Sequence, residues 1–281
     1  MRRSHLAAFA ALIGATPVGA QYGDLAPGGA VSWSLAGVLM EAAVTLAVDS
    51  TLVAGRVPRG FQAFTLREMA AGGDSAARAA LAAHPGFAGH VITTLGVARL
   101  DSMVVEGEAE RGSARPLTVA FWWVPVRLVD STAALPDPRA RPGAQLVELG
   151  LWTADPRFGE RLGAVMPTAS VAPLTVTWDG AGSWRIRLTI PNGTIAGRCR
   201  PVGTPTPTSY SLPAFSTVWA ADTAPGALAV FTYYGNQLQS CRGAWRARGE
   251  APLARALQDG AILSVGNQIG WRARAAAYRR R

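Results

Sequence analysis

The chain has 281 residues, a formal net charge of +9, and 49% hydrophobic against 16% charged residues. A chain of this length and hydrophobicity can bury one substantial core, so we expect a single domain over residues 21–270. All 27 side chains counted as lysine or arginine are arginines, because the sequence contains no lysine. This absence excludes a Schiff base on a side-chain amine, a P-loop lysine and a lysine general base.

The first residues have the pattern of a secretion signal. Two arginines after Met1 precede a short apolar stretch over residues 6–13, and Val18-Gly19-Ala20 supplies the small residues of a cleavage site. We therefore expect residues 1–20 to be a signal peptide and the protein to be secreted or periplasmic. The stretch is too short for a transmembrane helix, and Glu41 interrupts the next apolar run, so no transmembrane segment is expected.

Helix signals are few and short. Thr65 and Glu68 form the pattern of a capping box, and Asp74 has the position of a second N-cap after two glycines. Together these signals predict a broken helix over residues 66–83, which ends before a proline. Asp155-Pro156 similarly begins a helix that Gly163 ends, and a last short helix is expected from Pro252 to Leu257.

Most of the remaining chain alternates apolar and polar residues with a period of two, as strands do. Strands joined mainly by turns favour an antiparallel sheet, and this many favour closure of that sheet. The predicted fold class is a β-rich α+β fold, an antiparallel closed barrel or cone with a few short helices packed outside. The predicted strands lie near residues 42–48, 91–109, 117–128, 145–152, 172–178, 184–190, 194–200, 215–220, 228–234, 237–248 and 261–271.

The clearest hairpin signal is Asn192-Gly193, a dipeptide that suits a two-residue type I′ turn. With that turn, Arg187 lies opposite Arg198, and Arg185 lies opposite Arg200. Like charges directly opposite each other destabilise a sheet, so this face needs acidic neighbours, an anion or open solvent. We expect either a solvated outer face or an anion-binding patch. A three-residue turn that starts one residue earlier would break this pairing.

The two cysteines, Cys199 and Cys241, are an even number in a chain bound for an oxidising compartment. We expect them to form a disulfide, which would contribute roughly 3 to 4 kcal/mol by closing a loop. Neither these cysteines nor His84 and His90 have the spacing of zinc ligands, so no metal site is expected. No cofactor is expected either.

A buried polar pair is expected on the central strands. Arg127 shares a strand face with the apolar residues Val119, Phe121 and Trp123, and Glu148 lies on an otherwise apolar strand. We expect Arg127 and Glu148 to pair, either as a structural brace or as the polar anchor of an apolar pocket. A serine triad is not favoured, because the sequence has no Gly-x-Ser-x-Gly motif.

The last residues, 271–281, form a basic segment that ends in three arginines. Such a tail either contacts anionic lipid or cell wall, or is simply solvated. The excess of positive charge does not by itself indicate nucleic acid, since the chain lacks a recognisable nucleic-acid-binding motif.

Three segments resemble the acetoacetate decarboxylase-like superfamily. Residues 41–60 resemble its opening strand and the following turn, here Val57-Pro58-Arg59-Gly60. The run from Trp152 to Gly163 is similar to the segment that carries the family's Pro-Lys-Lys-Leu-Gly sequence, and Gly243 to Leu257 resembles its closing section. The resemblance implies a closed antiparallel cone with an internal, mostly apolar cavity for a small acid or ketone.

The chain departs from this family at its reactive residue. The family's decarboxylases form a Schiff base through a lysine, whereas this chain has Arg157 and Arg161 near the corresponding segment. A guanidinium does not lose its proton and is no nucleophile, but it can hold a carboxylate. We therefore expect a non-catalytic binder of a small anionic or amphiphilic molecule. The predicted ligand-binding residues are Arg127, Glu148, Arg157, Arg161 and Tyr233.

Two other functions remain open. One is a lysine-independent hydrolase or lyase that uses arginine and a carboxylate, with Glu148 as the base. The other is an envelope protein that acts through its arginine-rich surface, formed by Arg185, Arg187, Arg198 and Arg200, and through the C-terminal segment.

Overall fold

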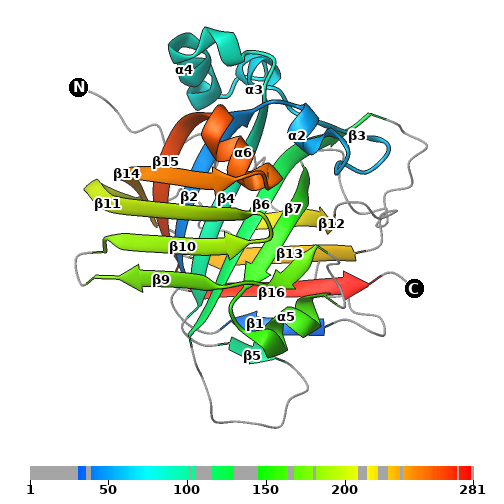
Figure 1. Ribbon diagram of the computed structural model, residues 1–281, viewed down its shortest axis with the longest axis vertical. Helices are drawn as coiled ribbons and strands as arrows, with labels where there is room; N and C mark the ends of the chain where they lie inside the picture. Colours follow the sequence, from blue (N-terminus) through cyan, green and yellow to red (C-terminus); the bar gives the residue numbers. More distant parts are fainter. Residues whose placement is uncertain are drawn as a thin grey trace.

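The computed structural model describes residues 31–35, 39–100, 103–105, 116–129, 145–163, 168–179, 182–207, 214–220, 227–234, 237–270 and 272–279 (Figure 1). Strands dominate these residues, and all of them join one sheet in the order β5-β1-β16-β13-β12-β7-β6-β4-β2-β15-β14-β11-β10-β9, while β3 pairs with β6 and β8 with β7. The signal peptide predicted over residues 1–20 lies outside the described residues.

Most strands follow the period-two segments of the sequence, but those at residues 31–35, 61–63, 169–171 and 272–279 were not predicted, and the predicted segment 91–109 is divided into two strands. The strands are β1 (Val31–Leu35), β2 (Leu39–Val48), β3 (Phe61–Ala63), β4 (Val91–Leu100), β5 (Met103–Val105), β6 (Leu117–Leu128), β7 (Gln145–Thr153), β8 (Ala169–Val171), β9 (Leu174–Trp178), β10 (Trp184–Ile190), β11 (Gly193–Pro207), β12 (Ala214–Ala220), β13 (Ala227–Tyr234), β14 (Gln237–Gly249), β15 (Ala261–Gly270) and β16 (Arg272–Arg279). The ladders are antiparallel except for β7 with β12 and β7 with β8, which are parallel. The predicted β-rich α+β class is confirmed.

The sheet curls so that its two ends cover opposite faces of the central strands β2, β4, β6 and β7 (Figure 1). Strands β9, β10, β11 and β14 cross in front of them, while β12 and β13 lie behind. The main core fills the space beneath the front strands, where Leu46, Leu95 and Trp122 of the central strands pack with Leu188 and Trp245. The barrel-like curvature therefore comes from one sheet folded over itself.

Short helices pack on the outside and ends of this sheet. They are α2 (Thr51–Ala54), α3 (Leu66–Ala71), α4 (Ser75–Ala83), α5 (Pro156–Gly163), α6 (Pro252–Asp259) and one 3₁₀ turn, η1 (Pro85–Phe87). The capping box at Thr65 is present, and Asp74 caps α4 by accepting hydrogen bonds from two backbone amides. Within the described residues, no helix combines the length and apolarity that crossing a bilayer requires.

The hairpin between β10 and β11 has a different register from the predicted one. Ile190 pairs with Gly193 and Arg185 with Arg198, so the two turn residues are Pro191 and Asn192. A type I′ turn needs positive φ at both central residues, which proline forbids. Asn192 alone has positive φ, 58°, as the second central residue of a type II turn does. The predicted pairings of Arg187 with Arg198 and of Arg185 with Arg200 are therefore wrong.

The shift is two residues, so every side chain stays on the face that the sequence predicted. Arg185, Arg187, Arg198 and Arg200 are all exposed on the outer face of the sheet. A register shift of two residues changes which residues lie opposite each other. It does not change which side chains point inward and which point outward.

The C-terminal basic segment is part of the sheet over most of its length. Residues Arg272–Arg279 form β16, which pairs with β13 on one side and with β1 on the other. The structure thus places these residues in a strand, where the sequence suggested a tail. Residues 271, 280 and 281 of the predicted tail lie outside the described residues.

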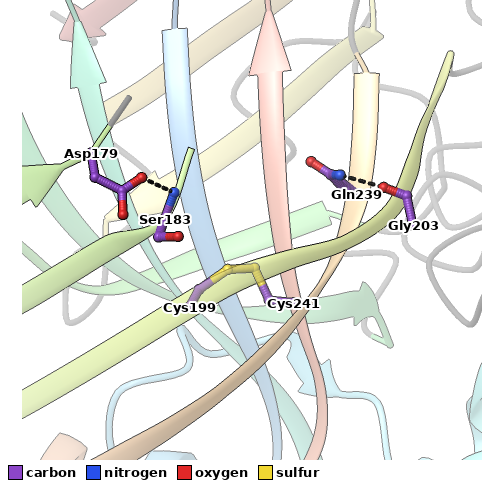
Figure 2. The surroundings of a disulfide bond; sticks show 6 residues. All are labelled: Asp179, Ser183, Cys199, Gly203, Gln239 and Cys241. Carbon is purple, nitrogen blue, oxygen red and sulfur yellow. Dashed lines mark hydrogen bonds between the residues drawn. A yellow bond between two sulfur atoms is a disulfide. The ribbon is translucent and has the colours of Figure 1, made fainter. Parts of the chain in front are cut away.

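The predicted disulfide between Cys199 and Cys241 is present, with Cα atoms 5.3 Å apart (Figure 2). It joins neighbouring strands diagonally, because Cys199 of β11 lies opposite Gly243 of β14 and Pro201 lies opposite Cys241. Figure 2 shows two hydrogen bonds nearby, from Gln239 to the carbonyl of Gly203 and from the amide of Ser183 to Asp179. The disulfide closes the loop of the chain that contains β12 and β13.

Reduction of this disulfide should lower the free energy of unfolding by about 3 to 4 kcal/mol, because it frees a loop with a sequence separation of 42. Urea denaturation with and without a reductant measures the change. The double variant Cys199→Ala with Cys241→Ala should reproduce it and should not respond to the reductant. An unchanged urea midpoint after complete reduction would contradict this prediction.

The hairpin turn makes a second prediction. Asn192→Ala should destabilise the protein by about 1 kcal/mol, since an alanine in the left-handed region is strained. Asn192→Gly is the matched control and should have little effect, because glycine adopts positive φ without strain. Equal destabilisation by both substitutions, measured by urea denaturation, would argue against the observed turn.

Candidate functional site

The face of the central strands opposite the main core carries most of their buried polar side chains. The register places Thr94 of β4 opposite Trp123 of β6, and Trp123 opposite Glu148 of β7. Residues directly opposite each other point to the same side of a sheet, so these three side chains form one row. The row is almost completely buried, with exposed fractions of 3% for Thr94, 8% for Trp123 and 2% for Glu148.

An apolar surface surrounds this row. Phe121 contacts Trp123 edge to face, with ring centroids 4.2 Å apart. The Phe121 ring also lies over Gly96 of β4, where any Cβ atom would collide with it. Glycine at this position therefore lets the aromatic ring lie flat along the sheet. Leu151 pairs with Phe121 and extends the apolar surface onto β7.

Glu148 is the main polar group of this surface. Its Oε1 atom accepts a hydrogen bond of 2.8 Å from the Thr168 hydroxyl, while its buried Oε2 atom has no hydrogen-bond partner among the described residues. Burial raises the pKa of Glu148 to about 8, and the hydrogen bond from Thr168 opposes this shift only in part. The carboxyl group is therefore mainly protonated at neutral pH.

A protonated Glu148 has a defined donor. Because Oε1 accepts from Thr168, the acidic proton belongs on Oε2, which then lacks an acceptor among the described residues. The hydroxyl of Thr94, in the same row, is also buried without a hydrogen-bond partner in the described part of the chain. The two groups flank Trp123 and are two strand spacings apart, about 10 Å.

A second buried acid lies farther along the same face. Glu41 of β2 pairs with Ala98 of β4, which pairs with Val119 of β6, so Glu41 shares the face of Glu148. It is 8% exposed, and burial raises its pKa to about 7. Both acids of this face therefore favour the neutral form more strongly than an exposed glutamate does.

The predicted ion pair between Arg127 and Glu148 is wrong. Arg127 forms an ion pair with Glu68, at 2.5 Å, and also donates to Gln62 at 2.9 Å. Desolvation opposes ionisation of Glu68, yet hydrogen bonds from Thr65 and the charge of Arg127 outweigh it and hold its pKa below the usual value. Short strand β3 brings Gln62 opposite Arg127, so Arg127 braces α3 against the sheet.

Three further ligand-binding residues were predicted from the sequence. Arg157 is exposed on α5. Arg161 lies on α5 and Tyr233 on β13, and the side chains of both are outside what the structure describes. Their roles stay predictions.

Arg56 is an arginine that the sequence did not single out. Its guanidinium donates a hydrogen bond of 2.8 Å to the carbonyl of Leu149 and lies 5.9 Å from the centre of the Trp122 ring. Leu149 is the extra residue at a bulge, because Trp122 pairs with Gly150 and Trp123 pairs with Glu148. Arg56 thus holds the carbonyl that the bulge removes from the ladder, next to Glu148. No motif in the sequence marks such a contact.

Within the described residues, no group of three or more His, Cys, Asp and Glu side chains is arranged to hold a metal ion. The described residues of this face offer a neutral carboxyl donor, a hydroxyl group and an aromatic surface.

Comparison with solved structures identifies the fold. The chain is similar to an acetoacetate decarboxylase-like enzyme from Sphingomonas wittichii RW1, with a TM-score of 0.53 and 11% identity over 95% of this chain and 98% of that chain. An acetoacetate decarboxylase from Legionella pneumophila gives a TM-score of 0.49 and 10% identity over 92% and 91% of the two chains. The enduracididine biosynthesis enzyme MppR, complexed with pyruvate, gives 0.48 and 12% over 94% and 96%.

The fold is thus acetoacetate decarboxylase-like, which confirms the resemblance seen in the sequence. At such low identity the likeness concerns the fold alone. No protein-family model matches the sequence, and no curated protein matches it.

Titration of Glu148 should make stability depend on pH. Its pKa is raised in the folded state, so its contribution is complete below 4.5 and is lost as the pH rises through about 8. Glu148→Gln removes this titration and keeps an oxygen that can accept from Thr168. The difference in unfolding free energy, variant minus wild type, should therefore rise from acidic to alkaline pH. The rise should be on the order of a few kcal/mol.

Urea denaturation at several pH values measures this difference. The exposed Glu160 of α5 supplies the control, since Glu160→Gln should follow the wild-type pH profile. Parallel profiles for the wild type and Glu148→Gln would show that Glu148 titrates normally.

Proposed function

We propose that the chain is an exported, non-catalytic binder of a small anionic or amphiphilic molecule, held on the Thr94, Trp123 and Glu148 face of an acetoacetate decarboxylase-like fold. The observation that supports this function best is the buried Glu148, whose Oε2 atom has no hydrogen-bond partner among the described residues. Buried polar groups in proteins are nearly always hydrogen-bonded, and a buried orphan indicates a missing partner. A carboxylate or carbonyl oxygen of a ligand supplies that partner.

The proposed ligand follows from the chemistry of the face. A neutral carboxyl donates to an oxygen acceptor, and in an apolar setting such a hydrogen bond to a carboxylate is strong. Trp123 and Phe121 provide an apolar surface for a short hydrocarbon or aromatic part. A small carboxylic acid or ketone combines these two features. The chain has no lysine, so binding is non-covalent with respect to a side-chain amine.

A lysine-independent hydrolase or lyase is the second candidate. The observation that favours it is the pKa of Glu148, about 8, because acids that transfer protons near neutral pH are tuned to such values. With this pKa, Glu148 would act as a general acid at neutral pH. The role of base, expected from the sequence, is disfavoured for the same reason.

A thermal-shift screen of small carboxylic acids and ketones tests the proposal. Compounds that bind should raise the melting temperature of the wild type, and the increase should decline as the pH rises through about 8, where Glu148 loses its proton. Glu148→Ala should lose most of the increase. Glu160→Gln, on the exposed side of α5, should retain it.

Two outcomes discriminate further. Stabilisation that is unaffected by Glu148→Ala would refute the site. Consumption of a stabilising compound, followed by mass spectrometry and abolished by Glu148→Ala, would favour the enzyme over the binder.

A further inference from the structure

The outer face of three adjacent strands, β10, β11 and β14, carries an extended group of exposed arginines. We call this surface the arginine face. Its members are Arg185, Arg187, Arg198, Arg200, Arg242, Arg246 and Arg248. The sequence predicted the members on β10 and β11, and the pairing of β11 with β14 adds the other three. This surface lies on the opposite side of these strands from the main core, which their inward side chains help to form.

Like charges are directly opposite each other at two places on the arginine face. Arg185 of β10 pairs with Arg198 of β11, and Arg200 of β11 pairs with Arg242 of β14. Such pairs destabilise a sheet. They bring no packing energy in return, because all four side chains are exposed.

The ion pairs seen among the described residues lie elsewhere. They join Arg127 to Glu68, and Arg255 to Glu250 and Asp259. The outward residues between the arginines are small and uncharged. They are Thr189, Thr194, Ala196 and Ala244, and Thr175 and Thr177 lie beside the arginines on the neighbouring strand β9.

We propose that the arginine face binds the phosphate groups of an anionic lipid surface. Guanidinium groups bind phosphate oxygens in a bidentate manner, and basic residues are attracted to anionic membranes. The arginines spread over three strands in width and over seven residues of β14, Arg242 to Arg248, about 20 Å in length. An area of this shape fits a plane of phosphate groups better than it fits one linear polyanion.

The kind of side chain between the arginines supports the same partner. Single-stranded nucleic acids are held by aromatic side chains that stack on bases, and the described residues of the arginine face include no aromatic side chain. Trp184 and Trp245, on the same strands, point into the core. Threonine and alanine do not insert into a bilayer either, so the contact is peripheral and electrostatic. It is independent of the ligand proposed for Glu148.

Co-sedimentation with vesicles tests this inference. The wild type should bind vesicles of phosphatidylcholine mixed with an equal amount of phosphatidylglycerol, should not bind vesicles of phosphatidylcholine alone, and should dissociate as the salt concentration rises. The triple variant with Arg187, Arg246 and Arg248 changed to Gln should bind at least about tenfold more weakly.

A charge-matched control separates the arginine face from the net charge. Changing Arg59, Arg67 and Arg78 to Gln removes the same charge from exposed positions near α2, α3 and α4, and should leave vesicle binding nearly unchanged. An equal loss in both triple variants would overturn the inference, as would absence of wild-type binding or binding that resists salt. Retention on DNA together with indifference to vesicles would overturn the lipid assignment.

The two pairs of opposite arginines allow a test in which weaker vesicle binding cannot be attributed to a loss of stability. Changing Arg198 and Arg242 to Gln removes one member of each pair, so it should weaken vesicle binding while the melting temperature stays level or rises. A clear fall in the melting temperature would mean that these arginines brace the sheet, and would overturn the inference.

Discussion

Burial of the central strands on both faces is the constraint from which the rest of the structure follows. Strands β2, β4, β6 and β7 have the front strands packed over one face and the far half of the curled sheet behind the other (Figure 1). A strand in this position is normally apolar throughout, because water reaches neither side. The polar side chains of these strands therefore stand out. The buried oxygens of Thr93, Thr94 and Glu148 have no partner in the described residues, and Thr94 and Glu148 lie on the face opposite the main core.

The same constraint explains how the chain distributes its charge. A glutamate can be buried because it can take up a proton and become neutral. The raised pKa values of Glu41 and Glu148 reflect this preference for the neutral form. An arginine cannot become neutral, so it remains at the surface or must be paired. Arg56 and Arg127 satisfy this need through a bulge carbonyl and a helix carboxylate. The outward residues of β10, β11 and β14 satisfy it through exposure.

Much of the fold could be predicted from the sequence because its signals are local. Alternation along each strand, the capping box at Thr65 and the N-cap at Asp74 involve residues within one or two turns of each other. The disulfide followed from the number of cysteines. Strand β16 was missed because Arg272–Arg279 is rich in alanine and lacks β-branched residues, so pairing with the distant β13 and β1 decides its structure.

The candidate site was harder to predict because its contacts are not local. Glu148 was identified as an acid on an apolar strand. Its partner Thr168 follows α5 in the sequence, and Arg127 forms its ion pair with Glu68 of α3. The bulge that aligns Trp123 with Glu148 leaves no mark in the sequence. The hairpin register failed for a local reason. In the predicted register Pro191 would lie opposite Thr194 without an N–H to donate, whereas proline suits the first central position of the observed turn.

Absence of lysine from an acetoacetate decarboxylase-like fold changes the kind of bond that its interior can make. A lysine amine can attack a carbonyl carbon and hold the substrate covalently. A protonated carboxyl, such as Glu148 at neutral pH, cannot form that covalent bond, but it can donate a hydrogen bond to a carbonyl or carboxylate oxygen. Such a hydrogen bond forms and breaks without any change in covalent bonds. A rise in pH through the pKa of Glu148 removes the donor and would place a negative charge beside the proposed ligand. In the proposed binder, an interior of this kind suits reversible capture, and the affinity depends on the proton that Glu148 carries.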